Sequence, residues 1–258
     1  MAEVLFYERP VPLNREGHKD LRIKSINSAA FAAKAHSVPL TVAEFGPAAR
    51  DFPILFGGPS LDDAGPMAML GLKESENAFI DARGQWEQGV YVPAFVRRYP
   101  FVLAENPEGA AEGEDFTVFL DEAYEGFNSE EGERLFNEDG TDTETLKQAV
   151  NFLGEFQEHV VRTRAFCKRM RELDLLEERS AEIKNADGSD AMVINGLYVI
   201  NEEKLRQLDE KVAHELLADG SLGWIYAHLL SMANIDRLKL RVDRRQAEKQ
   251  PAAATSEA

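Results

Sequence analysis

The feature that most constrains the fold is a long run of helical hydrophobic spacing in the second half of the chain. Between Thr141 and Leu176, apolar residues recur every three or four positions, at Leu146, Val150, Leu153, Phe156, Val160, Cys167, Met170 and Leu173. This spacing predicts one amphipathic helix, with Thr141 and Glu144 as a capping box and Gly154 as a weak point. At about 1.5 Å per residue an unbroken helix would reach about 45–50 Å, so it must pack across most of the molecule.

The sequence before this helix is typical of short strands and turns. Short apolar or β-branched stretches occur at 20–26, 37–41, 52–58, 65–72, 99–105 and 116–122, as expected for strands. A short helix interrupted near Gly46-Pro47 is expected at 41–52. We therefore expect residues 1–140 to form a mainly antiparallel β-sheet region with one or two short helices.

The part after the long helix combines a small β-unit with further helices. Asp187-Gly188 and Asn195-Gly196 are tight-turn dipeptides, and they predict a β-hairpin near 181–200. Asn201 is expected to cap a helix that ends at Gly220 and buries Leu205, Leu208, Val212 and Leu216. A last helix is expected from about Ser221.

These elements predict an α+β fold with a helical C-terminal region over 141–240. Residues 241–258 are expected to be a basic stretch followed by a disordered tail. Because the long helix should pack across both regions, the alternative of one continuous body over 5–240 stays open.

The charge of the chain is strongly negative and unevenly distributed. The net charge is −17, and the segment from Glu105 to Glu144 holds fifteen acidic residues against one basic residue, Arg134. This composition argues against nucleic acid and anionic lipid as partners. It is the expected composition of a solvated acidic face, with cation binding or a basic partner as the alternatives.

Compartment and membrane topology follow from what the chain lacks. A single cysteine, Cys167, rules out a disulfide within the chain, which fits a reducing compartment. The first residues do not form a secretory signal peptide, and no stretch has the length of apolar sequence that a membrane span needs. We expect a cytoplasmic location, with export without a signal peptide as the open alternative.

The sequence contains no complete catalytic or metal-binding motif. His214 begins a sequence similar to H-E-x-x-H, but Ala218 stands where the second histidine is needed. His18 and Asp20 match the start of an iron-binding facial triad without a suitably placed second histidine. Cys167 lies on the apolar stripe of the long helix, where core packing is the expected role. We therefore predict no catalytic residue, no metal site and no cofactor.

The strongest candidate for a binding site is the aromatic segment from Gly84 to Phe101. Trp86, Tyr91 and Tyr99 accompany the adjacent arginines Arg97 and Arg98, and an arginine fixed beside aromatic rings can stack and bind an anion through two hydrogen bonds. Residues 94–99 should form little more than one helical turn, which would point the two arginines in different directions. The alternative is that the aromatic side chains belong to the core and that one arginine bridges to the acidic segment.

Several sequence blocks resemble the bacterial SapC family in order along residues 5–240. They include "HSVPLTVAEFGPAARDFPILF", "NAFIDARGQW" with "YVPAFVRRYPF", "RLFNEDG", "NGLYVINEEKLRQL" and "AHLLSMANIDRL". The resemblance implies a setting near a bacterial surface layer or an outer-membrane uptake pathway, beside halogenase-like proteins. It implies no particular catalytic residues.

These observations favour a non-catalytic accessory protein that binds a protein partner or a small ligand. An enzyme, or an enzyme subunit that acts with an oxidative or halogenating partner, is the alternative. A homo-oligomer is also open, because the basic segment 237–249 could contact the acidic segment of a second copy.

Overall fold

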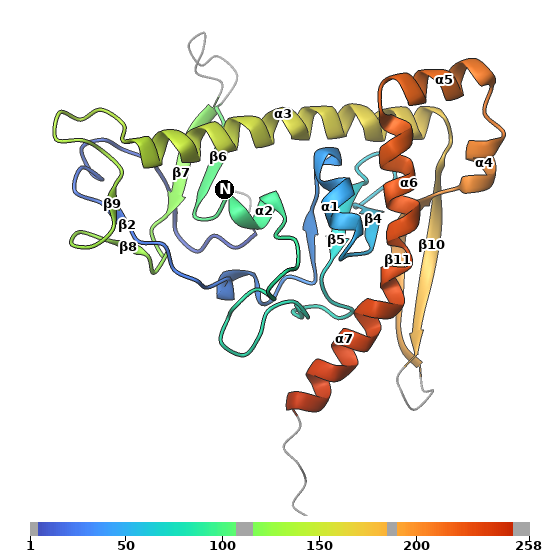
Figure 1. Cartoon of the computed structure of the whole chain (residues 1–258), viewed down its shortest axis with the longest axis horizontal. Coiled ribbons are helices and arrows are strands. Elements are labelled where there is room, and N and C mark those ends of the chain that lie inside the picture. The colour runs from blue at the N-terminus through green and yellow to red at the C-terminus, as the bar shows by residue number, and fades with distance from the viewer. Residues whose placement is uncertain (1–4, 107–115, 185–189, 250–258) are drawn as a thin grey trace, which may run out of the picture.

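The computed structural model describes residues 5–106, 116–184 and 190–249. Within these ranges the chain has an α+β fold, and every strand pair is antiparallel. The predicted fold class is therefore confirmed. Figure 1 shows two sheet regions side by side, with one long helix lying along both of them.

Three sheets carry the strands. The first has the order β1-β7-β6, formed by Pro10–Pro12, Phe116–Asp121 and Phe101–Glu105. A small ribbon has the order β8-β2-β9, formed by Phe127–Asn128, Arg22–Ile23 and Glu133–Arg134. The largest has the order β10-β11-β4-β5-β3, formed by Leu176–Lys184, Asp190–Ile200, Ile54–Gly57, Gly65–Met69 and Ser37–Pro39.

The position of β4 follows from its composition. All of its residues are apolar or glycine, and all are buried, as expected for a strand in the middle of a sheet with both faces covered. It is preceded by the short 3₁₀ helix η2 (Val42–Glu44) and by α1 (Phe45–Ala49), which form the interrupted helix predicted there. Another 3₁₀ turn, η1, covers Ala30–Ala32.

The long helix is α3, Glu144–Glu172. It contributes Leu146 and Leu153 to a smaller hydrophobic core beneath the first sheet. Further along, Phe156, Phe166 and Met170 belong to the larger core around β4 and β5. The helix runs unbroken through Gly154, and its packing ties the two cores together.

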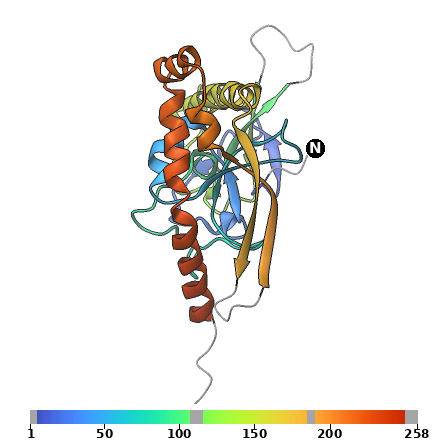
Figure 2. The same cartoon turned by 90° about the vertical axis from the view of Figure 1, so that its right-hand side faces the viewer.

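Four helices follow β11 in the described chain. They are α4 (Glu202–Arg206), α5 (Glu210–Ala218), α6 (Ser221–Ser231) and α7 (Asn234–Lys249). Of these, α6 packs against β4 and β11 of the largest sheet. Figure 2 shows α6 and α7 following one another beside the hairpin of β10 and β11. Residues 237–249 stand out in the sequence only for their basic composition, and in the structure they form most of α7.

One buried histidine fixes α6 to the largest sheet. Nδ1 of His228 lies 2.8 Å from the carbonyl oxygen of Ile54, and Nε2 accepts a hydrogen bond of 3.0 Å from the backbone N–H of Ile200. Since a carbonyl only accepts and an amide N–H only donates, the ring is neutral and protonated at Nδ1. Burial lowers the pKa of His228 to about 4.

The predicted start of the long helix is wrong by two residues. The N-cap is Thr143, whose hydroxyl accepts a hydrogen bond from the backbone N–H of Leu146. Thr141 instead bonds to Asp139 within the preceding turn, at 2.6 Å between Oγ1 and Oδ1. A local side-chain bond therefore competed successfully with the capping box.

Two predictions in the C-terminal half also need correction. Asn195-Gly196 is not a hairpin turn but lies inside β11, where Gly196 has a φ of 73° beside a shift in the strand register. Such a residue with positive φ is typical of a β-bulge. The helix from Asn201 to Gly220 is divided, because Asp209 accepts a hydrogen bond from the N–H of Lys211 and starts α5.

Other predictions are confirmed or fall outside the described ranges. The side-chain oxygen of Asn201 accepts from the N–H of Lys204 at 2.9 Å and caps α4. Residues 94–99 give α2, Ala94–Arg97. The dipeptide Asp187-Gly188 and the tail from residue 250 lie outside the described residues.

Candidate functional site

The structure distributes the five predicted site residues among different surroundings. Tyr91 and Arg97 meet at the surface near α3, Arg98 is largely buried, Tyr99 lines one cavity and Trp86 lines another. Trp86 and Tyr99, which stand near the two ends of the segment from Gly84 to Phe101, therefore line different cavities.

The short helix α2 is held by a buried carboxylate. Oε1 of Glu44 accepts hydrogen bonds from the backbone N–H of Ala94 at 2.6 Å and from the hydroxyl of Tyr91 at 3.0 Å. Its other oxygen accepts from the backbone and side chain of Thr41. Burial and the neighbouring Glu44 raise the pKa of Tyr91 to about 12, which keeps this tyrosine a neutral donor.

Arg97 is the arginine of the pair that faces solvent. Its Nε donates to the carbonyl of Val92 at 3.0 Å, and Nη2 lies 3.3 Å from the hydroxyl of Tyr91. Its guanidinium carbon lies 5.1 Å from the ring centroid of Phe152 on α3. These contacts hold Arg97 against its own segment, although it is exposed.

Arg98 turns inward between the helices. Its guanidinium carbon lies 3.9 Å from the ring centroid of Phe95 and 5.3 Å from that of Phe156. Burial lowers its pKa, and a hydrogen bond with the hydroxyl of Tyr7 counteracts this effect. Tyr7 in turn donates to the carbonyl of Phe101 at 2.7 Å. Arg98 thus packs the N-terminal segment onto α2 and α3.

Tyr99 is oriented by a fully buried carboxylate. Its hydroxyl donates to Oδ2 of Asp121 at 3.2 Å, and its ring stacks on Phe31 with centroids 4.0 Å apart. Burial and the nearby Asp121 raise the pKa of Tyr99. Asp121 also accepts hydrogen bonds from the backbone N–H groups of Glu8, Arg9 and Ala123.

Trp86 belongs to a loop that faces the C-terminal helix. Its ring lies nearly parallel to that of Phe79, with centroids 6.3 Å apart, and its backbone forms an isolated bridge with Ile80. The indole Nε1 is buried and has no hydrogen-bond partner among the described residues. Such an unpaired donor is uncommon in a folded protein.

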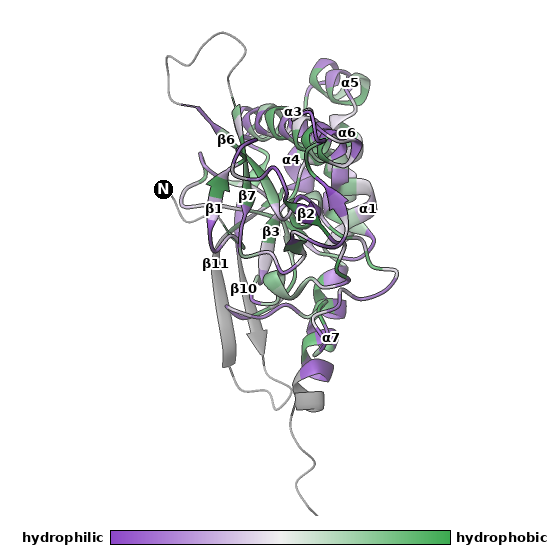
Figure 3. Ribbon diagram, turned by 90° about the vertical axis from the view of Figure 1, so that its left-hand side faces the viewer, coloured by the Kyte–Doolittle hydropathy of each residue, from purple (hydrophilic) through white to green (hydrophobic). Residues whose placement is uncertain are grey.

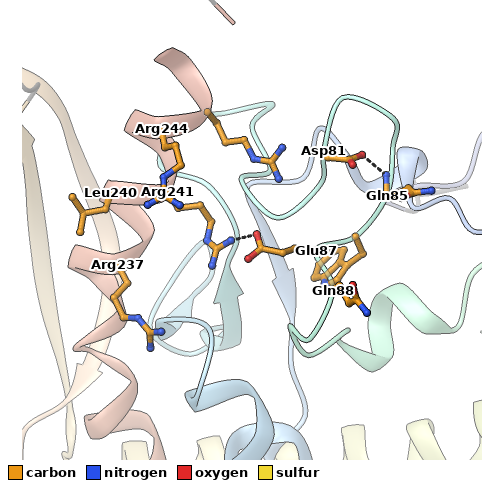
Figure 4. A pocket seen from close by; sticks show the side chains of 10 residues that line it. Asp81, Gln85, Glu87, Gln88, Arg237, Leu240, Arg241 and Arg244 are labelled. Atoms are coloured by element: carbon orange, nitrogen blue, oxygen red, sulfur yellow. Dashed lines mark hydrogen bonds and ion pairs between the residues drawn. The ribbon is translucent and has the colours of Figure 1, made fainter. Parts of the chain in front are cut away.

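A cavity of about 640 Å³ separates this loop from α7, and we call it the arginine cavity. Its lining combines loop residues with one face of the helix: Asp81, Gln85, Trp86, Glu87, Gln88, Arg237, Leu240, Arg241, Arg244 and Arg245. Figure 4 shows Arg237 and Arg241 extending from α7 toward the side of the loop, while Arg244 lies along the helix and Leu240 points the other way.

One of these arginines is already paired. Arg241 forms an ion pair with Glu87 across the cavity, drawn as a dashed line in Figure 4. Its guanidinium carbon also lies 4.4 Å from the ring centroid of Phe79. Burial and the neighbouring arginines Arg245 and Arg244 lower the pKa of Arg241. The ion pair and the ring contact attach α7 to the loop.

The remaining arginines leave positive charge unbalanced. Arg237 donates to the carbonyl of Arg50 and to the side chain of Asn234. Arg244 and Arg245 form no hydrogen bond or close ion pair with the part of the chain that the structure describes. Arg245 lies near enough to Asp81 to help lower the pKa of that carboxyl, behind the larger effect of the hydrogen bond from Gln85.

The sequence indicates the basic segment 237–249 but does not indicate that it lies beside Trp86. The signal was present, because Arg237, Arg241 and Arg244 are spaced four and three residues apart. Residues at this spacing lie on one face of a helix. What the sequence did not show was that this face meets the loop at 81–88.

The other reactive side chains considered in the sequence have structural surroundings. Cys167 is buried, and burial raises the pKa of its thiol to about 11, so the reactive thiolate is disfavoured. His18 accepts a hydrogen bond from the N–H of Asn14, and Asp20 pairs with Arg134. Within the described ranges no group of three histidine, cysteine, aspartate or glutamate side chains is arranged to hold a metal ion.

The described structure is that of an α+β protein with a charged cavity between a loop and its last helix. A family model described as SapC matches residues 13–238, and the chain belongs to this family. The resemblance seen in the sequence blocks is therefore confirmed. No curated protein and no solved structure matches the chain. Across the described residues, none of the helices combines the length and apolar character needed to cross a membrane.

Proposed function

We propose that this SapC-family protein is a non-catalytic accessory protein that binds an anionic ligand in the arginine cavity. The observation that carries the proposal is the group of four arginines around a cavity of about 640 Å³ in a chain whose net charge is −17. A local positive site on a negative protein concentrates field at the cavity and selects anions from solution.

The available donors set the charge of the ligand. Arg241 is neutralised by Glu87, whereas Arg244 forms no ion pair among the described residues and Arg245 has only the longer-range attraction of Asp81. Two guanidinium groups with fixed fork geometry suit a phosphate or a dicarboxylate, which can accept several hydrogen bonds at once. The proposed ligand is therefore a small molecule with at least two negative charges.

Trp86 adds an apolar wall to this charged site. Its ring lines the cavity opposite the helix, and its buried Nε1 has a hydrogen still to donate. The predicted role of Trp86 in binding is kept in this proposal, whereas Tyr91, Arg97 and Arg98 are assigned to holding the segment 91–101 in place.

The family membership suggests the setting in which such binding would serve. A SapC protein near a surface-layer or outer-membrane uptake pathway would act as an accessory component that presents or senses an anionic compound. The buried state of Cys167 and the neutral, fully hydrogen-bonded His228 support a binding role over nucleophilic catalysis.

The test uses inorganic pyrophosphate as the probe and Trp86 as the reporter. A Trp224→Phe variant leaves Trp86 as the single tryptophan, so a change in fluorescence reports on the cavity. We expect a saturable change that weakens by about tenfold or more when Arg244→Gln and Arg245→Gln are added, since each charged hydrogen bond contributes roughly 1.5–3 kcal/mol.

The matched control removes the same charge elsewhere. Arg164 and Lys168 are exposed on α3, so Arg164→Gln with Lys168→Gln should leave pyrophosphate affinity within about twofold. Equal weakening in both double variants would show a general charge effect and overturn the proposal. Failure of pyrophosphate, phosphate and succinate to bind at 0.15 M salt would overturn it as well.

A further inference from the structure

A second cavity, lined in part by Tyr99 of the segment 86–101, has the reverse chemistry. It measures about 270 Å³ and is lined by four aromatic rings and two carboxylates, together with small or apolar residues. We call it the aromatic cavity, and its characteristic residues are Phe6, Phe31, Tyr99, Tyr124, Glu8 and Glu125.

The rings surround the cavity from different directions. Phe31 stacks on Tyr99 at 4.0 Å, and Tyr124 meets Tyr99 edge-on at 5.6 Å with an interplanar angle of 83°. Phe6 meets Phe31 edge-on at 5.4 Å and 73°. Phe6 and Tyr124 thus stand at large angles to the stacked pair of Phe31 and Tyr99. Such a group presents both ring faces and ring edges to a shared space, as an aromatic cage does.

The charges around these rings are negative. Among the lining residues Glu8 and Glu125 are acidic and exposed, and none is a lysine, arginine or histidine. Behind Tyr99, the carboxylate of Asp121 accepts the phenol hydrogen. This hydrogen bond increases the electron density of the Tyr99 ring and strengthens its attraction for a cation.

Three basic residues that are next to or two positions from lining residues in the sequence are directed to other partners. The Lys24 ammonium pairs with Glu131, Arg9 donates to the carbonyl of Glu122, and Arg98 bonds to Tyr7. None of the three lines the cavity, so they leave its negative charge without a counterion in the described part of the chain.

We propose that the aromatic cavity binds an alkylated ammonium group of a small organic cation. Aromatic faces attract a cation with diffuse charge and an apolar surface, and nearby carboxylates add longer-range attraction. A volume of about 270 Å³ accommodates a trimethylammonium group with a short substituent. This proposal is independent of the arginine cavity, since the two sites share no lining residue.

Calorimetric titration with two isosteric probes tests it. Choline carries a trimethylammonium group, and 3,3-dimethylbutan-1-ol has the same shape with a neutral carbon in place of nitrogen. We expect choline to bind at least tenfold more tightly than the alcohol. Equal binding of the two would show an ordinary apolar pocket, and absence of choline binding up to 20 mM would also overturn the proposal.

Paired variants locate the binding. Tyr124→Leu removes a ring and should weaken choline binding by about 2- to 30-fold, the range of a single cation–π contact. Tyr124→Phe removes only the hydroxyl, which bonds to the carbonyl of Lys24, and should bind choline as the unaltered protein does. If Leu and Phe have the same effect, the ring is not a ligand and the site is wrong.

A surface substitution keeps the test sound if Tyr124→Leu disturbs folding. Glu125 is exposed, so Glu125→Gln should weaken choline binding about threefold without lowering the melting temperature. Glu130→Gln makes the same charge change at an exposed position outside the cavity and should have no effect. Equal effects of the two substitutions would overturn the proposal.

Discussion

His228 makes the stability of this protein depend on pH in a defined window. The ring donates to Ile54 and accepts from Ile200, so protonation at Nε2 would place two hydrogens against each other inside the core. Burial lowers the pKa of His228 in the folded state to about 4, from the ordinary value of 6.5. The unfolded chain therefore binds the proton more readily than the folded chain does.

The sign and the size follow from this difference in pKa. The contribution of His228 to stability is complete above pH 6.5 and falls as the pH drops from 6.5 toward 4, where the folded state also becomes protonated. A difference of 2.5 pKa units corresponds to about 3 kcal/mol at pH 4. By pH 5 the same relation gives a loss of about 2 kcal/mol.

The assay compares urea unfolding of the unaltered protein and His228→Gln at pH 7.5, 6.5, 5.5 and 5.0. Glutamine cannot be protonated in this range but retains one donor and one acceptor. We expect the free energy of unfolding of the unaltered protein to fall by about 2 kcal/mol more than that of the variant between pH 7.5 and 5.0. His214→Gln, at an exposed position on α5, should follow the unaltered protein.

The measured quantity is the difference between two proteins, so carboxylates that titrate in both cancel. A difference that stays constant within about 0.5 kcal/mol across the four pH values would refute the reasoning. It would mean that the ring is solvated or protonated in the folded state.

Three further predictions concern stability. Arg98→Ala should lower the free energy of unfolding by about 2–4 kcal/mol because it leaves a packed site empty. Arg97→Ala should lower it by less than about 1 kcal/mol. If chemical denaturation gave the reverse order, the inward orientation of Arg98 and the outward orientation of Arg97 would be contradicted. Glu44→Gln should cost about 1.5–3 kcal/mol, since both carboxylate oxygens accept from a backbone N–H and the amide nitrogen of glutamine can replace neither; a melting temperature unchanged within 1 °C would disprove it. Gly196→Ala should destabilise the fold by about 1 kcal/mol because φ is 73° there, and a stabilised variant in thermal melts would refute the positive φ.

The stretches predicted best are those in which local interactions decide the structure. The cap at Asn201 and the helical spacing of α3 depend on residues within a few positions of one another. Asn195-Gly196 was predicted wrongly because the same positive φ serves a hairpin turn and a bulge, and only the pairing of β11 with β10 distinguishes them.

The sequence by itself determined the α+β class, the long helix and the presence of two arginine-bearing segments. Periodicity and capping act over one or two helical turns and can be recognised along the chain. The sequence alone did not determine that Arg98 would turn inward onto Phe95 while Arg97 remained exposed.

Only the tertiary structure decided which polar side chains contact one another. Arg241 and Glu87 are separated by 154 positions, and Tyr99, which lies just before β6, meets Asp121 at the end of β7, the strand paired with β6. Contacts of this kind depend on how α7 and the sheets pack as whole bodies, because burial of apolar surface fixes the elements and then brings distant polar side chains together.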